Sequence, residues 1–405
     1  MKRHLVPIFI IVLVNFVGSN MVLPTLPLYA QRHFDSSPEN ITAMLGSYFI
    51  ALFIAAPVIG RLSDRYGRLP VLIVSQMGTV IGFLILANAT AMWQLFLARV
   101  LDGITGGNII VAQAYITDIS PREERTRSLG VVWMAFGMGS IMGPAVGGYL
   151  SALADDRAPF WIGALVATLT VVLTRLALRE TLTPERRAER MAALSRSGTL
   201  TLRDALRQAS LLLILVTAYS VQFSMALLTS TFALFGAAVI FSGQPPAVQS
   251  VGVGTLLMMI GVGQLLTQLL WIKPLIERYG ERRLILVGTL LRAFSLLLVA
   301  ASAFPVVAGL SLLLFASASG IMMPSLQSLA TVSVSEERSG AVLGYYQSAT
   351  SLGIISGTLL GGVLFAAAPQ LPFLVGAAIL IIVALPAVLR LQRIPVFSPE
   401  LVPTA

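Results

Sequence analysis

The sequence predicts an all-α membrane protein with twelve transmembrane helices in two pseudo-symmetric six-helix bundles. Three observations support this fold class: an apolar composition, a series of long apolar runs, and an internal repeat. Of the 405 residues, 56% are hydrophobic and only 11% are charged, which is less than half the charged fraction of an average soluble domain. The composition therefore excludes an ordinary soluble protein.

The apolar runs have the length of membrane spans, each of which takes about 20 residues to cross the hydrocarbon core. Short polar segments separate them, because charged side chains enter hydrocarbon only at high cost. We expect spans at residues 5–30, 41–59, 69–89, 93–117, 127–152, 159–178, 208–240, 248–272, 283–303, 306–330, 338–366 and 371–391. No small-residue cleavage site follows the first run, so we expect a span there and not a signal peptide.

A charged segment between the second and third runs recurs in the second half of the chain. Residues 60–68 read GRLSDRYGR and residues 275–281 read LIERYGE, so that Asp64 corresponds to Glu277 at an offset of 213. The triplet EER at 123–125 recurs at the same offset, and three glycines of the fifth span recur at an offset of 214. A duplicated helical unit is typical of secondary transporters, whose site lies between the two halves.

The repeat predicts the domain organisation. We expect an N-terminal six-helix bundle at residues 1–180 and a C-terminal six-helix bundle at residues 208–405. Residues 181–207 between them are rich in Arg and Glu and are predicted to form a cytoplasmic linker.

The positions of Lys and Arg predict the orientation. If the N-terminus is cytoplasmic, the outer loops contain only Arg32 and Arg157, and Arg99 and Arg292 fall inside spans. The positive-inside rule then predicts a multi-pass protein of the inner (plasma) membrane with both termini in the cytoplasm. The net charge of +9 is accordingly interpreted as a cytoplasmic collar that faces anionic headgroups, and no nucleic-acid partner is expected.

Composition and motifs also argue against several function classes. The chain has no cysteine, and its two histidines lie outside the apolar runs, so we expect no disulfide, metal site or cofactor. No P-loop is present, which argues against ATP-driven transport. No span contains a His/Cys/Asp constellation or a Ser nucleophile with a base, which argues against a membrane enzyme. The duplicated architecture with charged loops argues against a channel.

Several motifs resemble the major facilitator superfamily. The pattern G-x-L-x-D-R-x-G-R at 60–68 resembles the loop signature of that family, and Arg99-x-x-x-Gly103 looks like its proton-linked motif. The stretches AYITDISP at 114–121 and PTLP at 24–27 are similar to the tetracycline and multidrug exporter branch. A pattern in the fifth span resembles the antiporter motif of the family: Gly139, Gly143, Pro144, Gly147 and Gly148. The resemblance covers nearly the whole chain and implies a drug:proton antiporter that works by alternating access.

The chain departs from the family pattern at three positions. Leu69 replaces a second basic residue after Arg68, and Thr358 stands where the first copy of the antiporter motif has Pro144. Exporters of the tetracycline type carry an acid in the first span where this chain has Asn15. The substrate and the proton carrier therefore stay open at this point.

The loop motif is interpreted as a gating latch. Asp64 and Arg68 end the second span, and Asp118 ends the fourth span on the same side. A carboxylate–guanidinium pair there can join the halves when the cytoplasmic side is closed. The alternative is that these residues only keep a short loop polar. The candidate latch residues are Gly60, Asp64, Arg65, Gly67, Arg68, Asp118, Glu277 and Arg278.

Arg99 and Asp102 are the candidate proton-coupling residues. They lie three residues apart inside the fourth span, so they share one helical face, and intramembrane charges are functional by default. A carboxylate beside an Arg can alternate between an ion-paired and a protonated state as water access changes. The alternative is a static pair that holds the span against its neighbours.

The glycines of the fifth span permit close helix packing, and Pro144 permits a bend. We expect this face to pack against the eighth span and to seal one side of a cavity; ordinary packing without a gating role is the alternative. Candidate substrate-cavity residues are Asn15, Gln222, Gln264, Arg292, Tyr345 and Gln347.

A mostly apolar cavity suits lipophilic or amphipathic compounds. The leading function is therefore proton-coupled export of lipophilic small molecules by a monomer that contacts membrane lipids. A lipid or glycolipid flippase of the same fold is the alternative, favoured by Arg292.

Overall fold

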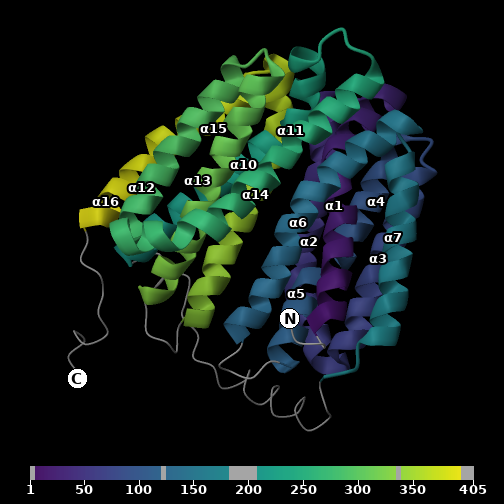
Figure 1. Cartoon of the computed structure of the whole chain (residues 1–405), viewed down its shortest axis with the longest axis horizontal. Helices are drawn as coiled ribbons and strands as arrows, with labels where there is room; N and C mark the ends of the chain where they lie inside the picture. The colour runs from purple at the N-terminus through teal and green to yellow at the C-terminus, as the bar shows by residue number, and fades with distance from the viewer. Residues whose placement is uncertain (1–4, 120–124, 182–207, 334–338, 394–405) are drawn as a thin grey trace. The chain divides into compact units, whose positions relative to one another are not determined.

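The computed structural model describes residues 5–119, 125–181, 208–333 and 339–393, which form helices joined by short connections (Figure 1). Ten segments in that part of the chain are long and apolar enough to cross a membrane. One of them, Pro246–Ala301, has 56 residues and is interrupted by non-helical backbone at Gly280, so it contains two spans. Together with a further 29-residue helix, Arg125–Leu153, these segments account for the twelve predicted spans and confirm the all-α membrane class.

The chain folds into two packing units. The first contains the helices up to residue 177 together with Phe232–Gly261, and the second contains the described residues of 208–231 and 262–393. The predicted division at 180 and 208 follows the sequence repeat and stays a prediction. The predicted linker lies outside the described residues, except for Thr181.

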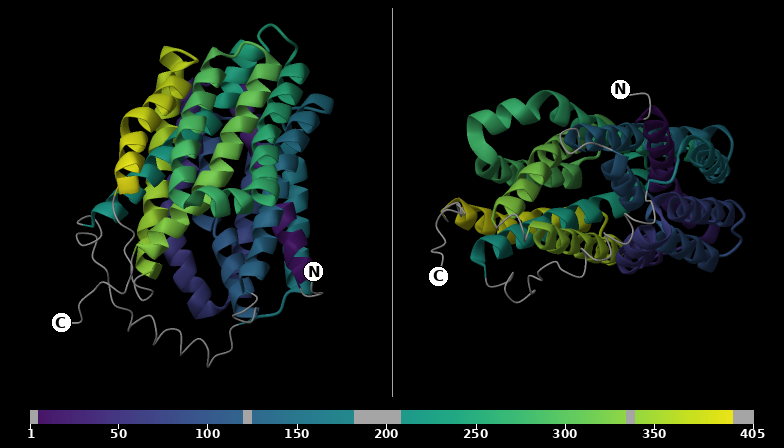
Figure 2. Two further views of the ribbon diagram at one scale, coloured as in Figure 1. Left: turned by 60° about the vertical axis from the view of Figure 1, so that its left-hand side comes forward. Right: turned by 90° about the horizontal axis from the view of Figure 1, so that it is seen from below.

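Unit 1 is built on seven helices near the N-terminus. These are α1 (Leu5–Phe34), α2 (Pro38–Tyr66), α3 (Arg68–Ala87), α4 (Met92–Thr105), α5 (Asn108–Ile119), α6 (Arg125–Leu153) and α7 (Ala158–Ala177). Within this unit α1 packs along α6, α2 along α4, and α3 along α7. Figure 2 shows the same helices from two further directions.

The remaining helices begin after residue 208. They are α10 (Ala209–Phe235), the π-helical η2 (Gly236–Ile240), α11 (Pro246–Leu266), η3 (Thr267–Trp271), α12 (Ile272–Ala301), α13 (Pro305–Val332), α14 (Ser339–Ala367), α15 (Leu371–Ile379), η5 (Leu380–Ala384) and α16 (Leu385–Arg393). In unit 2, α12 packs along α13.

The repeated charged segment forms the same turn in both halves. Gly67 has φ 108° and ψ 160°, and Gly280, 213 residues later, has φ 73° and ψ 156°. A residue with a Cβ adopts this backbone conformation only with strain, whereas glycine adopts it readily. The positive φ angle at this turn therefore explains why glycine recurs at this offset.

The span predicted at 93–117 is present, but two helices form it. α4 ends at Thr105 and α5 begins at Asn108, with Gly106 and Gly107 between them. Each glycine disfavours a helix by about 1 kcal/mol relative to alanine, which explains a break at this pair. The break places Asn108 at the start of a helix in the middle of the span.

Candidate functional site

The Arg99–Asp102 pair lies in α4 of unit 1. The guanidinium Nη1 of Arg99 donates to Oδ2 of Asp102 at 3.0 Å, and the hydroxyl of Thr79 on α3 donates to Oδ1 at 3.0 Å. The Arg99 guanidinium also lies over the ring of Tyr48 on α2, 4.3 Å from its centroid. Each carboxylate oxygen thus has one partner, and the cation has a second contact that does not depend on the carboxylate.

The glycine of the Arg-x-x-x-Gly motif explains this placement. A Cβ added to Gly103 would lie 2.5 Å from the Tyr48 carbonyl oxygen and 2.7 Å from the Ala51 Cβ. Only glycine therefore permits α4 to approach α2 closely enough for the Tyr48 ring to meet Arg99. The sequence predicted the pair on one helical face, but the contributions of Tyr48 and Thr79 were missed.

Arg68 forms the centre of an ion cluster at the other end of α2. Its Nε donates to Oδ2 of Asp118 at 2.9 Å, its Nη1 donates to the Ser63 hydroxyl at 2.7 Å, and its Nη2 lies 2.7 Å from Oδ1 of Asp64. Only 2% of the Arg68 side chain is exposed. One buried guanidinium thus connects α2, α3 and α5 within unit 1.

Glu180 completes this cluster, and the sequence reasoning missed it. Its carboxylate accepts hydrogen bonds from the backbone N–H groups of Arg68 and Leu69, both at 3.0 Å. The first N–H groups of a helix lack partners within the helix, and Gly67 has no side chain to cap α3. A carboxylate is favoured there by the helix dipole. The position of an acid just after the sixth span was therefore the sequence feature that could have predicted this contact.

The other latch candidates of the first copy lie around this cluster. Arg65 is exposed, with its guanidinium 5.4 Å from the centroid of the Tyr66 ring. Gly60 faces open space, and Gly67 provides the turn.

The second copy keeps the turn without the buried cluster. The offset of 213 places Glu281 where the first copy has Arg68. Glu277 is exposed and lies 4.0 Å from Lys273, and the Arg278 guanidinium is 5.5 Å from the Tyr279 ring centroid.

We expect Arg68→Ala to lower the melting temperature of the purified protein and to reduce transport. The substitution removes the cation that two carboxylates contact, and breaking a buried ion pair costs about 3–5 kcal/mol. Arg61→Ala is the matched control, because Arg61 is exposed in the same segment and donates to the Pro57 carbonyl oxygen. Equal melting temperatures for the two variants would contradict a supporting role for the cluster.

The glycines of the antiporter motif place α6 against α1. An added Cβ would lie 2.5 Å from the Phe16 Cβ at Gly139, 2.5 Å from the Asn20 Cβ at Gly143 and 2.7 Å from the Met21 carbonyl oxygen at Gly147. The glycine face was expected to pack against the eighth span, but Gly139, Gly143 and Gly147 face α1, whereas Pro144 and Gly148 on the neighbouring face of α6 meet α11. A Cβ on Gly254 would lie 2.5 Å from the Pro144 carbonyl oxygen, and one on Gly148 would collide with the backbone at Ser250.

The second half repeats this packing inside unit 2. On α14, a Cβ added to Gly353 or Gly357 would lie 2.5 Å from a carbonyl oxygen of α10, and one on Gly361 would lie 2.7 Å from the Ser230 hydroxyl. α14 and α10 thus correspond to α6 and α1. The antiporter pattern therefore serves close helix packing in both copies.

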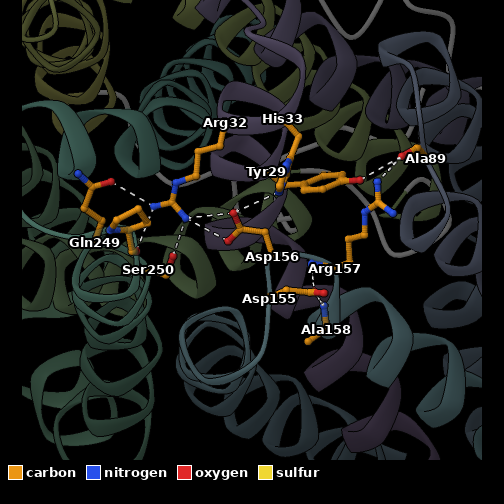
Figure 3. A network of polar contacts seen from close by, with 11 residues as sticks. Tyr29, Arg32, His33, Ala89, Asp155, Asp156, Arg157, Ala158, Gln249 and Ser250 are labelled. Atoms are coloured by element: carbon orange, nitrogen blue, oxygen red, sulfur yellow. Dashed lines mark hydrogen bonds and ion pairs between the residues drawn. The ribbon is translucent and has the colours of Figure 1, made fainter.

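Arg32 joins three segments at the end of α1 (Figure 3). Its Nη1 donates to Oδ1 of Asp156 and to the Ser250 hydroxyl, both at 3.0 Å. Its Nη2 donates to Oε1 of Gln249 at 3.1 Å and to the Pro246 carbonyl oxygen at 3.2 Å. One guanidinium therefore connects α1, the α6–α7 loop and the start of α11.

Two further contacts support this arrangement, which we call the Arg32 clamp (Arg32, Asp156, Pro246, Gln249 and Ser250). His33 Nε2 lies 3.5 Å from Oδ2 of Asp156. The Gln249 Nε2 donates to the Gln244 carbonyl oxygen at 3.2 Å, which turns its own oxygen toward Arg32. The sequence placed Arg32 in a loop and gave no partner for it, because its partners lie 124 to 218 residues away.

We expect Arg32→Ala to loosen α11 from α1. The substitution removes five hydrogen bonds from one cation, two of them to the Asp156 carboxylate, and hydrogen bonds to charged groups contribute about 1.5–3 kcal/mol each. Spin labels at Gln31→Cys and Val248→Cys report the separation, and the chain has no other cysteine. The distance distribution should broaden toward longer values.

Arg157→Ala is the control for the clamp. It removes the same charge at the same end of unit 1, but Arg157 donates to the Ala89 carbonyl oxygen (Figure 3). A distribution that Arg32→Ala leaves unchanged would refute the clamp.

Arg292 is fully buried within unit 2. Its Nη1 donates to the Ser319 hydroxyl at 2.9 Å, its Nη2 donates to the Val221 carbonyl oxygen at 2.7 Å, and the guanidinium lies 4.3 Å from the Phe315 ring centroid. In the part of the chain that the structure describes, it has no carboxylate partner. The offset of 213 makes Phe315 the counterpart of Asp102. The second half thus has an aromatic ring at the position where the first half has an acid, and the Arg292 guanidinium packs against that ring.

The other predicted cavity residues are distributed over both units. Asn15 lines a pocket in unit 1. The remaining four belong to α10, α11 and α14 of unit 2: Gln222, Gln264, Tyr345 and Gln347. A single cavity that joins all of them stays a prediction.

The chain matches the family model described as Major Facilitator Superfamily over residues 8–262 and again over 226–404. It is 33% identical to the tetracycline resistance protein, class C, of Escherichia coli over 390 residues, covering 94% of each chain. It is also 26% identical to multidrug resistance protein 2 of Bacillus subtilis (strain 168) over 384 residues, covering 93% of each.

Solved structures show the same fold. A bacterial homologue of the human lysosomal transporter Spinster, crystallised in an inward-facing and unoccupied conformation, superposes with a TM-score of 0.79 at 17% identity, over 98% of this chain and all of that one. The human organic anion transporter MFSD10 superposes with a TM-score of 0.67 at 22% identity, over 96% of this chain and 99% of that one.

Proposed function

The chain belongs to the major facilitator superfamily, and from this premise we propose that it exports lipophilic or amphipathic small molecules in exchange for protons by alternating access. As a member of this family it is a multi-pass membrane transporter and not an enzyme. The observation that supports proton coupling best is the Arg99–Asp102 pair, because it places one carboxylate against one cation inside a span.

Asp102 is the proposed proton carrier. Its side chain is 21% exposed and that of Arg99 is 11% exposed, so the carboxylate lies at the edge of the protein interior. Protonation of Asp102 breaks the ion pair while Arg99 keeps its contact with the Tyr48 ring, which lowers the cost of the neutral state. Asn15, the corresponding polar residue of the first span, cannot carry a proton in this way.

Two polar clusters are the proposed gates. Arg68 follows α2 and Arg32 precedes it, so the Arg68 cluster and the Arg32 clamp lie at opposite ends of a 29-residue helix. With both termini in the cytoplasm, the Arg68 cluster lies on the cytoplasmic side and the Arg32 clamp on the outer side. Each proposed gate joins its helices in one state and releases them in the other.

The proposed partners follow from this function. They are a small lipophilic substrate, protons and the lipids of the inner membrane around a monomer. Substrate contacts are proposed for the predicted cavity residues, whose sparse polar groups suit compounds with a large apolar body.

A lipid or glycolipid is the second candidate substrate, and Arg292 is the observation that favours it. A buried cation whose described partners are a hydroxyl, a carbonyl oxygen and a ring is suited to an anionic headgroup. This candidate predicts transport of fluorescent lipids and no transport of drugs.

Reconstituted protein tests both candidates. Purified protein in proteoliposomes is given an imposed proton gradient and a panel of fluorescent dyes, antibiotics and headgroup-labelled lipids. We expect gradient-dependent movement of lipophilic dyes or antibiotics, abolished by a protonophore. Transport of lipids alone would favour the second candidate. Transport at the same rate with and without the proton gradient would refute proton coupling.

A further inference from the structure

Three side-chain amides meet in a pocket of unit 1. Asn15 comes from α1, Gln76 from α3 and Asn108 from the first turn of α5. The remaining lining is apolar and comes from the same three helices. The pocket has a cavity volume of about 20 Å³, which is enough for one group of about the size of a water molecule. It therefore has room for a single small group, such as one nitrogen with its hydrogens.

Two carbonyl oxygens in this pocket have no hydrogen-bond partner among the residues that the structure describes. They are Oε1 of Gln76 and Oδ1 of Asn108, and both atoms are buried. The Gln76 side chain is 2% exposed, and its Nε2 donates to the hydroxyl of Thr174 on α7 at 2.9 Å. That bond directs the nitrogen toward α7 and leaves the oxygen for the pocket. A buried acceptor without a donor is unfavourable, so this site is suited to a donor group.

The position of the pocket on α3 adds an electrostatic preference. Thr79 lies three residues after Gln76, on the same helical face, and its hydroxyl donates to Asp102. A carboxylate is therefore held near the same face of α3, one turn from the amide. The lining itself contains no charged residue. Partial negative charge from amide oxygens favours N–H groups and disfavours anions.

We propose that the Asn15–Gln76–Asn108 pocket binds the N–H-bearing end of the exported substrate, with an amine or ammonium nitrogen donating to Gln76 and Asn108. This inference rests on the proposed export function and specifies which group of the substrate enters unit 1. It also makes Gln76 and Asn108 specificity-determining residues.

Equilibrium binding of a matched ligand pair tests this proposal. The probes are a fluorescent lipophilic primary amine and its N-trimethylated analogue, which carries the same charge and body without N–H donors. Two hydrogen bonds at about 1 kcal/mol each predict that the full-length protein binds the amine more tightly by about tenfold or more. Gln76→Met and Asn108→Leu should each bring the ratio of the two dissociation constants toward one.

Two further variants keep the test decisive. Gln76→Glu has acceptors only, so it should restore the preference for the amine that Gln76→Met loses. Asn88→Leu is the control, since this exposed amide ends α3 far from the pocket and donates to the Leu84 carbonyl oxygen. Melting temperatures establish that each variant is folded.

The possible outcomes separate this inference from the proposed function. Equal binding of the two probes by the unmodified protein, or a preference that survives both Gln76→Met and Asn108→Leu, overturns the inference. A preference for the trimethylated probe also overturns it. If proteoliposomes still export dyes under a proton gradient in those cases, the proposed function stands without the pocket. If the protein prefers the amine but proteoliposomes export no dye, the pocket stands and the proposed function is refuted.

Discussion

Asp102→Asn should reduce proton-driven export to below about one tenth of the rate of the unmodified protein, a loss that corresponds to at least about 1.4 kcal/mol in the barrier. Asparagine keeps the shape of the side chain and an oxygen that can accept from the Thr79 hydroxyl. It cannot bind or release a proton between pH 5 and 8. The measurement is dye accumulation in vesicles under an imposed pH gradient.

Asp102→Glu is the control for charge, because it keeps a titratable carboxylate within reach of Arg99. It should retain a substantial part of the gradient-driven rate. Because Arg99 keeps its contact with the Tyr48 ring, we expect Asp102→Asn to insert in the membrane in normal amounts. If its vesicles still concentrate dye in proportion to the pH gradient, another group carries the proton.

Gly143→Leu should abolish transport and lower the melting temperature. Even a Cβ at this position would lie 2.5 Å from the Asn20 Cβ and 2.9 Å from the Val17 carbonyl oxygen. The backbone of α1 cannot shift aside as a flexible side chain can. The larger side chain therefore forces α6 to separate from α1. Overpacking of this kind costs about 1–3 kcal/mol and occasionally more. Dye export and thermal unfolding in detergent measure the effect.

The same helix provides a matched control. Gly130 also lies in α6, and no atom of the described part of the chain lies within 4 Å of the position of its Cβ. Gly130→Leu should therefore leave both export and melting temperature close to those of the unmodified protein. If Gly143→Leu behaves like Gly130→Leu, the close approach of α6 to α1 is not required for transport.

The fold was largely predictable because the bilayer imposes a length and a composition on each span. Helices that must satisfy their own backbone hydrogen bonds in hydrocarbon appear in the sequence as apolar runs. α12, for example, continues to Ala301 where a span was expected to end at 303. The break between α4 and α5 was not predicted, although Gly106 and Gly107 were its visible signal.

The candidate site was predictable where its residues are close in sequence. Arg99 and Asp102 share a helical face because of their spacing, and Asp64 and Arg68 are one turn apart. Partners from distant helices were missed: Tyr48 and Thr79 at Asp102, Glu180 at Arg68, and Asp156 at Arg32. The predicted roles of these residues in coupling and gating stay predictions.

The sequence by itself determined the membrane class, the helical spans, the duplication and the two glycine turns, because hydrophobic length and backbone conformation are local properties. Only the tertiary structure decided which groups meet: the ring over Arg99, the acid on the first turn of α3, the clamp at Arg32 and the amide pocket. Each of these depends on how closely neighbouring helices approach, and glycines such as Gly103 and Gly148 permit that approach without indicating which helix lies opposite.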